Sequence, residues 1–128
     1  MSRYVDPTEQ LVIEVAVTDI RRSVAFYRSL GFELLRDDGQ FVELTWEGHR
    51  LFLEQRAALG PEPAGAPSFR GTNVRVMVPD VDACWALVQA IGAPIVAPIG
   101  DRYYGLRDFT ITDPDGFGIR FASRLPGR

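Results

Sequence analysis

The chain has a single cysteine, Cys84, and no apolar run approaching the ~20 residues of a membrane-spanning helix. One cysteine excludes an internal disulfide bond and gives no sign of an oxidising compartment. The first ten residues, MSRYVDPTEQ, lack the apolar stretch and the small-residue cleavage pattern of a signal peptide. We therefore expect a cytoplasmic protein with no membrane contact.

Positive charge and histidine are also scarce. The net charge is −3, whereas a protein that binds a phosphate backbone normally shows a basic stripe, so no nucleic-acid partner is expected. The only histidine, His49, lies in a predicted turn, WEGHR, where a solvated side chain is expected rather than a metal ligand. The sequence has no phosphate-binding loop, dinucleotide fingerprint or Ser-His-Asp arrangement, which removes the commonest catalytic motifs.

An internal duplication is the strongest positive signal in the sequence. The segment IEVAVTDIRRSVAFYRSLGF can be laid over VRVMVPDVDACWALVQAIGA without a gap at an offset of 61 residues. Asp19 then falls on Asp80 and Gly31 on Gly92. In each copy an alternating strand leads to an aspartate that can cap a helix, and a glycine ends that helix.

Three short strands are predicted to follow each helix, with turn signals at Asp38-Gly39, Glu47-Gly48 and the DPDG run at 113–116. The fold class is therefore α+β, a single domain of two βαβββ modules at 9–56 and 69–124, joined by a linker rich in Pro, Ala and Gly at 57–68. One helix covers only one face of a four-stranded sheet. The two uncovered sheet faces are therefore expected to line a cleft.

Two motifs resemble the vicinal oxygen chelate superfamily, which includes glyoxalase I, extradiol dioxygenases and the fosfomycin and bleomycin resistance proteins. They are VAVTDIRRSVAFYRSLGF near the start and YYGLRDFTITDPDGFGIRF near the end. In active members of that superfamily, the first and last strand of each module supply four metal ligands. The resemblance places these positions at Val12, Glu54, Asn73 and Arg120.

This set of four residues is unsuited to a divalent cation. Only Glu54 is a good ligand, Val12 cannot coordinate, and the Arg120 guanidinium stays charged. We expect neither a metal nor another cofactor. Glu54 and Arg120 occupy equivalent places in the two modules, so they either pair with each other where the metal would lie or have separate partners.

The run GDRYYGLRDF resembles the loop of the metal-free bleomycin resistance proteins, with Tyr104 in place of their tryptophan. The resemblance implies antibiotic resistance by a homodimer that sequesters a small molecule in grooves between subunits, without turnover. Tyr103 and Tyr104 are the preferred ligand contacts because a glycine-bounded loop cannot bury both. The further expected ligand contacts are Trp46, Phe52, Glu54, Asn73, Arg75 and Arg120.

Several alternatives remain open from the sequence. Trp46 and Phe52 fit either the core or the ligand site. Glu14, Glu43 and Asp108 are possible carboxylates for a cationic ligand, whereas Arg75 and Arg120 favour a carboxylate, a phosphate or a planar acceptor. A lyase, isomerase or dioxygenase of the same superfamily is the alternative function, with Glu54 as a buried general base in the metal-free case.

Overall fold

The structure is a computed structural model that describes residues 4–56 and 70–127. The chain divides into two compact units, Met1–Glu62 and Pro63–Arg128, and each is described by itself. The linker predicted at 57–68 lies outside the described residues. The elements of the first unit are α1(Pro7–Gln10), β1(Ile13–Val17), α2(Ile20–Leu30), β2(Glu33–Asp37), β3(Phe41–Trp46) and β4(His49–Gln55).

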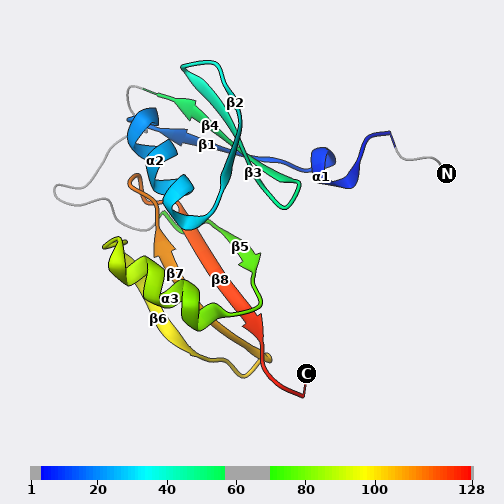
Figure 1. Cartoon of the computed structure of the whole chain (residues 1–128), viewed down its shortest axis with the longest axis vertical. Helices are drawn as coiled ribbons and strands as arrows, with labels where there is room; N and C mark the ends of the chain where they lie inside the picture. Colours follow the sequence, from blue (N-terminus) through cyan, green and yellow to red (C-terminus); the bar gives the residue numbers. More distant parts are fainter. Residues whose placement is uncertain (1–3, 57–69, 128) are drawn as a thin grey trace. The chain divides into compact units, whose positions relative to one another are not determined.

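The first unit is a mixed four-stranded sheet in the order β1-β4-β3-β2 with α2 packed on one face (Figure 1). β1 runs parallel to β4, and the other neighbouring pairs are antiparallel. The helix buries Val24, Tyr27 and Leu30, and the Tyr27 ring meets the Phe32 ring edge-on at 5.3 Å. The short helix α1, capped by Asp6 and begun by Pro7, was not predicted from the sequence.

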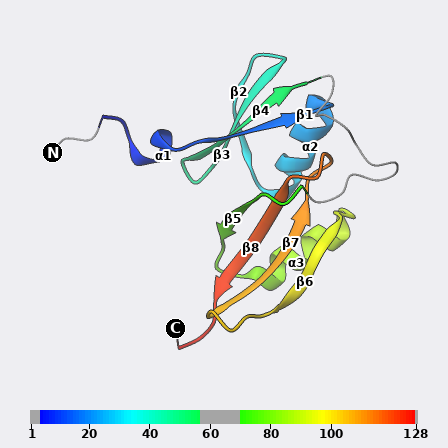
Figure 2. The same cartoon turned by 180° about the vertical axis from the view of Figure 1, so that it is seen from behind.

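The second unit repeats this plan with β5(Asn73–Met77), α3(Val81–Ala90), β6(Ile95–Asp101), β7(Leu106–Thr112) and β8(Gly118–Arg124). Its sheet order is β5-β8-β7-β6, again with one parallel pair, β5 and β8. Seen from behind, β6, β7 and β8 lie in front of α3 (Figure 2). The prediction of two βαβββ modules is confirmed.

The two helices begin at the predicted caps. The Asp19 carboxylate accepts a hydrogen bond from the backbone N–H of Arg22 at 3.2 Å, and Asp80 accepts one from Ala83 at 3.1 Å. The last strand of each unit also ties down the start of its helix. The Gln55 side chain accepts from the Ile20 N–H at 2.8 Å, and the Ser123 hydroxyl accepts from the Val81 N–H at 3.0 Å.

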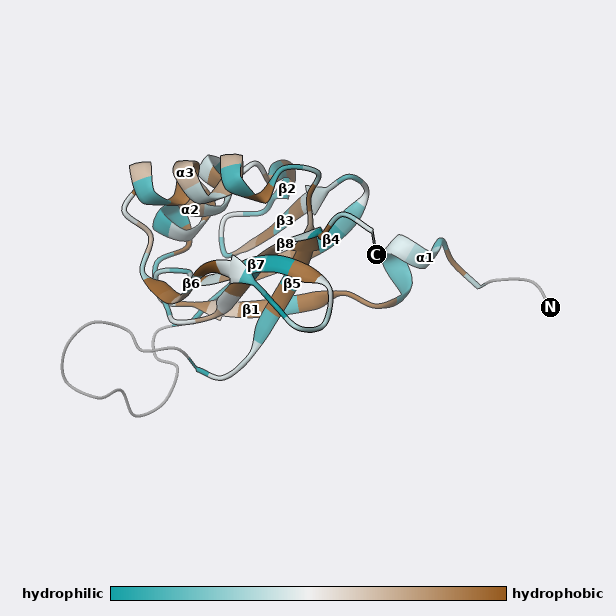
Figure 3. Ribbon diagram, turned by 90° about the horizontal axis from the view of Figure 1, so that it is seen from below, coloured by the Kyte–Doolittle hydropathy of each residue, from teal (hydrophilic) through white to brown (hydrophobic). Residues whose placement is uncertain are grey.

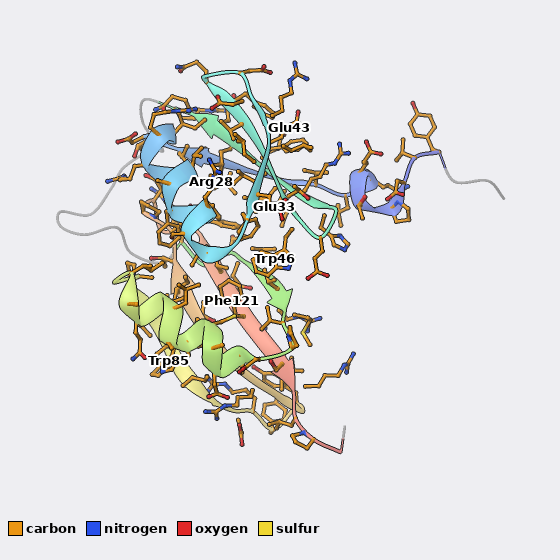
Figure 4. All side chains as sticks on the ribbon, in the orientation of Figure 1. Arg28, Glu33, Glu43, Trp46, Trp85 and Phe121 are labelled. Carbon is orange, nitrogen blue, oxygen red and sulfur yellow. The ribbon has the colours of Figure 1, made fainter. Side chains whose placement is uncertain are left out.

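Most side chains facing α3 are apolar, although Arg107 and Ser123 at the end of this face bond to the helix. The opposite face of the second sheet carries the charged residues Asp108 and Arg120. Trp85 of α3 packs edge-on against Phe109 at 5.1 Å, and Phe109 lies 5.6 Å from Phe121 (Figure 4). Trp85 is therefore a packing residue of the second unit. Because side chains alternate along a strand, Asp108 and Arg120 point to the face that α3 leaves uncovered. Both α2 and α3 alternate between hydrophobic and hydrophilic segments (Figure 3), as helices covered on one side do.

Gly31 ends α2 in the left-handed region at φ +118°, and a Cβ added there would lie 3.1 Å from the Trp46 ring. Gly39 has φ +86°, but a Cβ there would meet nothing within 4 Å. We expect Gly39→Ala to lower the free energy of unfolding by about 1 kcal/mol, the backbone cost alone. Gly31→Ala should lower it further because Trp46 must also move. Urea unfolding of both variants tests this, and equal losses would contradict the contact with Trp46.

Candidate functional site

A tight turn joins β6 to β7 and presents two tyrosines at its tip. The Arg102 N–H donates to the Leu106 carbonyl at 2.7 Å, and the Gly105 N–H donates to the Arg102 carbonyl at 3.1 Å. Gly105 has φ +91°, a conformation that favours glycine. Tyr103 is 94% exposed, and its ring meets the Tyr104 ring edge-on at 5.2 Å.

A buried carboxylate anchors this turn to the sheet. Asp108 is 3% exposed and accepts three hydrogen bonds. They come from Arg102 Nε at 2.7 Å, the Tyr104 hydroxyl at 2.6 Å and Arg120 Nε at 3.0 Å. Buried charges require partners of this kind. Asp108 lies on the predicted face, but its oxygens are occupied within the protein, so the expectation that it serves a cationic ligand is wrong.

Arg102 was missing from the sequence prediction. Besides its bond to the Asp108 carboxylate, Arg102 links β6 to β7. Its Nη2 donates to the Pro98 carbonyl of β6 at 2.6 Å and to the Asp108 carbonyl of β7 at 3.1 Å. The only available signal was an arginine in a glycine-bounded loop, which does not reveal its partner. The next arginine along, Arg107, pairs with Asp82 of α3 and with Asp101, so it is not part of the cluster around Asp108.

The hydrogen bonds fix the charge state of this cluster. Burial alone would raise the pKa of Asp108, but the Tyr104 hydroxyl, Arg102 and the charge of Arg120 together hold it below its usual value. The hydrogen bond to Asp108 and burial raise the pKa of the Tyr104 hydroxyl. The Arg120 guanidinium lies over the Tyr104 ring at 5.4 Å, within cation–π range. An ionised Asp108 therefore fixes a neutral Tyr104 and two charged arginines.

The metal-ligand positions do not form a donor set. Arg120 brings a permanent positive charge, held in place by Asp108. In the first sheet Glu54 is level with Ala16. Val12 lies four residues before Ala16, so Val12 and Glu54 are about 13 Å apart along the strand direction. Among residues 4–56 and 70–127, no three His, Cys, Asp or Glu side chains are grouped so that they could hold a metal ion. The residues present therefore do not fit the metal of the active superfamily members.

Glu54 and Arg120 each have a partner within their own unit. Arg56 Nη2 lies 3.2 Å from a Glu54 oxygen, and Arg120 bonds Asp108. The structure thus shows the second of the two arrangements that the sequence left open. The Glu54 side chain is 44% exposed, so the burial that its general-base role required is absent.

The uncovered face of the first sheet is aromatic and acidic. Phe52 stands in register between Glu14 on β1 and Glu43 on β3, and its ring lies 5.4 Å from that of Phe41. Trp46 belongs to the other face, since its ring packs on Phe32 at 5.1 Å (Figure 4). Its predicted role as a ligand contact is therefore corrected: Trp46 packs at the end of α2.

The two remaining predicted contacts, Asn73 and Arg75, lie on β5 and are exposed. Arg75 is level with Arg120 of β8, and Asn73 is level with Gly118. They share the uncovered face of the second sheet with Asp108. The structure thus brings Tyr103, Tyr104, Arg75 and Arg120 to one face of one unit, and places Phe52 and Glu54 on the uncovered face of the other.

Comparison with known proteins gives the family. A profile of the Glyoxalase/Bleomycin resistance protein/Dioxygenase superfamily matches residues 10–121. The chain belongs to this superfamily. Bleomycin resistance proteins of Geobacillus stearothermophilus and Staphylococcus aureus are each 29% identical to this chain over 130 residues. The match covers 91% of this chain and 97% of each relative. The resemblance stated from the two sequence motifs is confirmed.

Solved structures share this fold. TioX from Micromonospora sp. ML1 superposes with a TM-score of 0.71 at 30% identity, over 90% of this chain and 98% of TioX. A bleomycin resistance determinant encoded on the transposon Tn5 gives a TM-score of 0.69 at 18% identity, over 91% and 98% of the two chains, a likeness of fold alone.

Within the described residues, no helix has the length and apolar character needed to cross a membrane.

Removing the carboxylate should destabilise the second unit. We expect Asp108→Asn to lower the free energy of unfolding near pH 7 by about 2–3 kcal/mol, because two arginines lose their counter-charge. The loss is smaller than for a fully buried pair, since the Arg102 and Arg120 side chains keep 30% and 26% of their exposure. Urea unfolding measures it, with Asp101→Asn as the control on an exposed ion pair.

The contribution of Asp108 to the free energy of unfolding should decrease as the pH falls. The pKa of Asp108 is lower in the folded protein than in the unfolded chain, so its stabilisation is present above about pH 4 and lost as pH falls through the folded value. The gap in unfolding free energy between wild type and Asp108→Asn should therefore narrow towards pH 2. A difference in unfolding free energy that stays constant from about pH 7 to pH 2 would show that the charge of the carboxylate does not stabilise the folded protein.

Proposed function

We propose that this protein is a metal-independent small-molecule-binding protein that sequesters an aromatic or polar antibiotic-like ligand without chemical turnover. The observation that carries the proposal is the exposed Tyr103 ring on a turn fixed by the buried Asp108. Exposed aromatic rings are suited to stacking on a flat ligand. The bonds that Asp108 accepts from Arg102 and Tyr104 hold the turn before any ligand arrives, which reduces the entropy lost on binding.

The relatives support the same proposal. Proteins named for bleomycin resistance match nearly the whole chain, and the GDRYYGLRDF run resembles the ligand loop of that branch. By this resemblance, we propose that the protein acts in the cytoplasm as a homodimer whose ligand lies in a groove between subunits.

Binding and recovery experiments test the proposal. The protein is titrated with a panel of aromatic antibiotics that includes a bleomycin-class glycopeptide, and quenching of intrinsic fluorescence gives the affinity. The compound is then extracted and compared by mass with the starting material. We expect at least one tight ligand, recovered unchanged, and the same affinity after dialysis against a chelator. Conversion of the compound, or loss of binding with the chelator, would overturn the proposal.

Tyr103→Ala tests the contact directly. The side chain is almost fully exposed, so its removal should leave the thermal midpoint unchanged, whereas the loss of one stacking contact of about 1 kcal/mol should weaken binding about fivefold. Tyr4→Ala is the matched control, because Tyr4 is 93% exposed and lies before α1. Isothermal titration of the ligand found above measures both variants, and equal affinities would remove Tyr103 from the site.

A further inference from the structure

We propose that Arg75 and Arg120 form a subsite for an oxyanion, a carboxylate or a phosphate, carried by an aromatic ligand. The inference rests on the proposed function, whose ligand it defines further. It concerns only the face of the β5-β8-β7-β6 sheet that lies opposite α3.

The two arginines are neighbours across the parallel pair. Arg75 of β5 is in register with Arg120 of β8, so their backbones lie about 5 Å apart and their side chains leave the sheet on the same face. Like charges placed opposite each other on a sheet are destabilising unless an anion lies between them. A bound oxyanion would therefore relieve the repulsion between the two guanidinium groups.

The guanidinium groups keep free donors. Arg120 gives Nε to Asp108, and within residues 4–56 and 70–127 its two terminal nitrogens have no hydrogen-bond partner, nor has the Arg75 side chain. The guanidinium groups of Arg102 and Arg120 share the single carboxylate of Asp108, because Tyr104 stays neutral. Arg75, level with Arg120, adds a further positive charge. This face of the sheet is therefore locally positive on a chain whose net charge is −3.

An exposed arginine is usually only solvated, and Arg75 alone would give no reason to propose a binding site. Arg120 gives that reason, because its side chain is only 26% exposed and is fixed by Asp108 and by the Tyr104 ring. A fixed guanidinium can bond two oxygens of one oxyanion with little further loss of freedom. The chain has no lysine, and all 14 of its basic residues are arginine.

The aromatic part of the ligand follows from the same cluster. Tyr104 lies against the Arg120 guanidinium and Tyr103 extends beyond it. A ring joined directly to an oxyanion could therefore contact the tyrosines while its charged group meets the arginines. Aryl carboxylates and aryl phosphates share this chemistry.

Small probes separate the charged subsite from the rest of the ligand. Benzoate, phenyl phosphate and the neutral benzamide are titrated into ¹⁵N-labelled protein, and the arginine Nε–H resonances are followed. We expect one or both anions to shift Arg120 and Arg75, and to bind at least tenfold more tightly than benzamide. Preference for benzoate or for phenyl phosphate identifies the oxyanion. Equal affinity of both anions and benzamide would overturn the subsite.

A charge-matched pair of variants tests the position. Arg75→Gln should weaken anion binding about tenfold, the loss of one charge-assisted contact. Arg124→Gln removes the same charge from β8 about 13 Å from Arg120, beyond the screening length of physiological salt, and should change little. Equal effects of the two variants would overturn the subsite and leave only a general charge effect.

The two proposals fail separately. If an antibiotic binds unchanged but no anionic probe does, the oxyanion subsite is wrong and the sequestration proposal stands. If the anions bind at Arg75 and Arg120 but every bound antibiotic is converted, the subsite stands and sequestration is wrong.

Discussion

The buried carboxylate of Asp108 is the contact on which the candidate site depends. It is 3% exposed and accepts hydrogen bonds from Arg102, Tyr104 and Arg120. Ionised in a low-dielectric place, it would be costly without these donors. Once they are present, the same charge fixes the turn between β6 and β7, orients the Tyr104 ring and fixes the Arg120 side chain. The stability of this turn and the proposed ligand contacts therefore depend on the same carboxylate.

Duplication explains why the two modules carry different chemistry on equivalent faces. Each has one helix on one face of its sheet, so each leaves a strand face free to change without disturbing the core. In the first module that face holds Phe52 between two glutamates. In the second it holds Arg75 and Arg120 with Asp108 beside them. The cores under α2 and α3 stay apolar, while the uncovered faces have diverged in the sign of their charge.

Most of the fold could be predicted from the sequence because its signals are local. The caps at Asp19 and Asp80 and the closing Gly31 act within a few residues, and each is found where it was expected. The faces were harder to predict. Trp46 and Phe52 lie on different strands, so which of them meets α2 depends on how β3 pairs with β4 and on how the helix docks. The bonds of Arg102 to Asp108 depend on a turn whose geometry no local pattern determines.

The guanidinium at a metal-ligand position and the bonds of Asp108 are linked. A guanidinium at position 120 repels a divalent cation, and left unpaired it would itself be costly to half-bury. Asp108, on the neighbouring strand, supplies the missing negative charge. The carboxylate neutralises only part of the positive charge around it, because Arg102 and Arg75 are also present. This face is therefore unsuited to a cation, and its remaining positive charge supports the proposed oxyanion subsite.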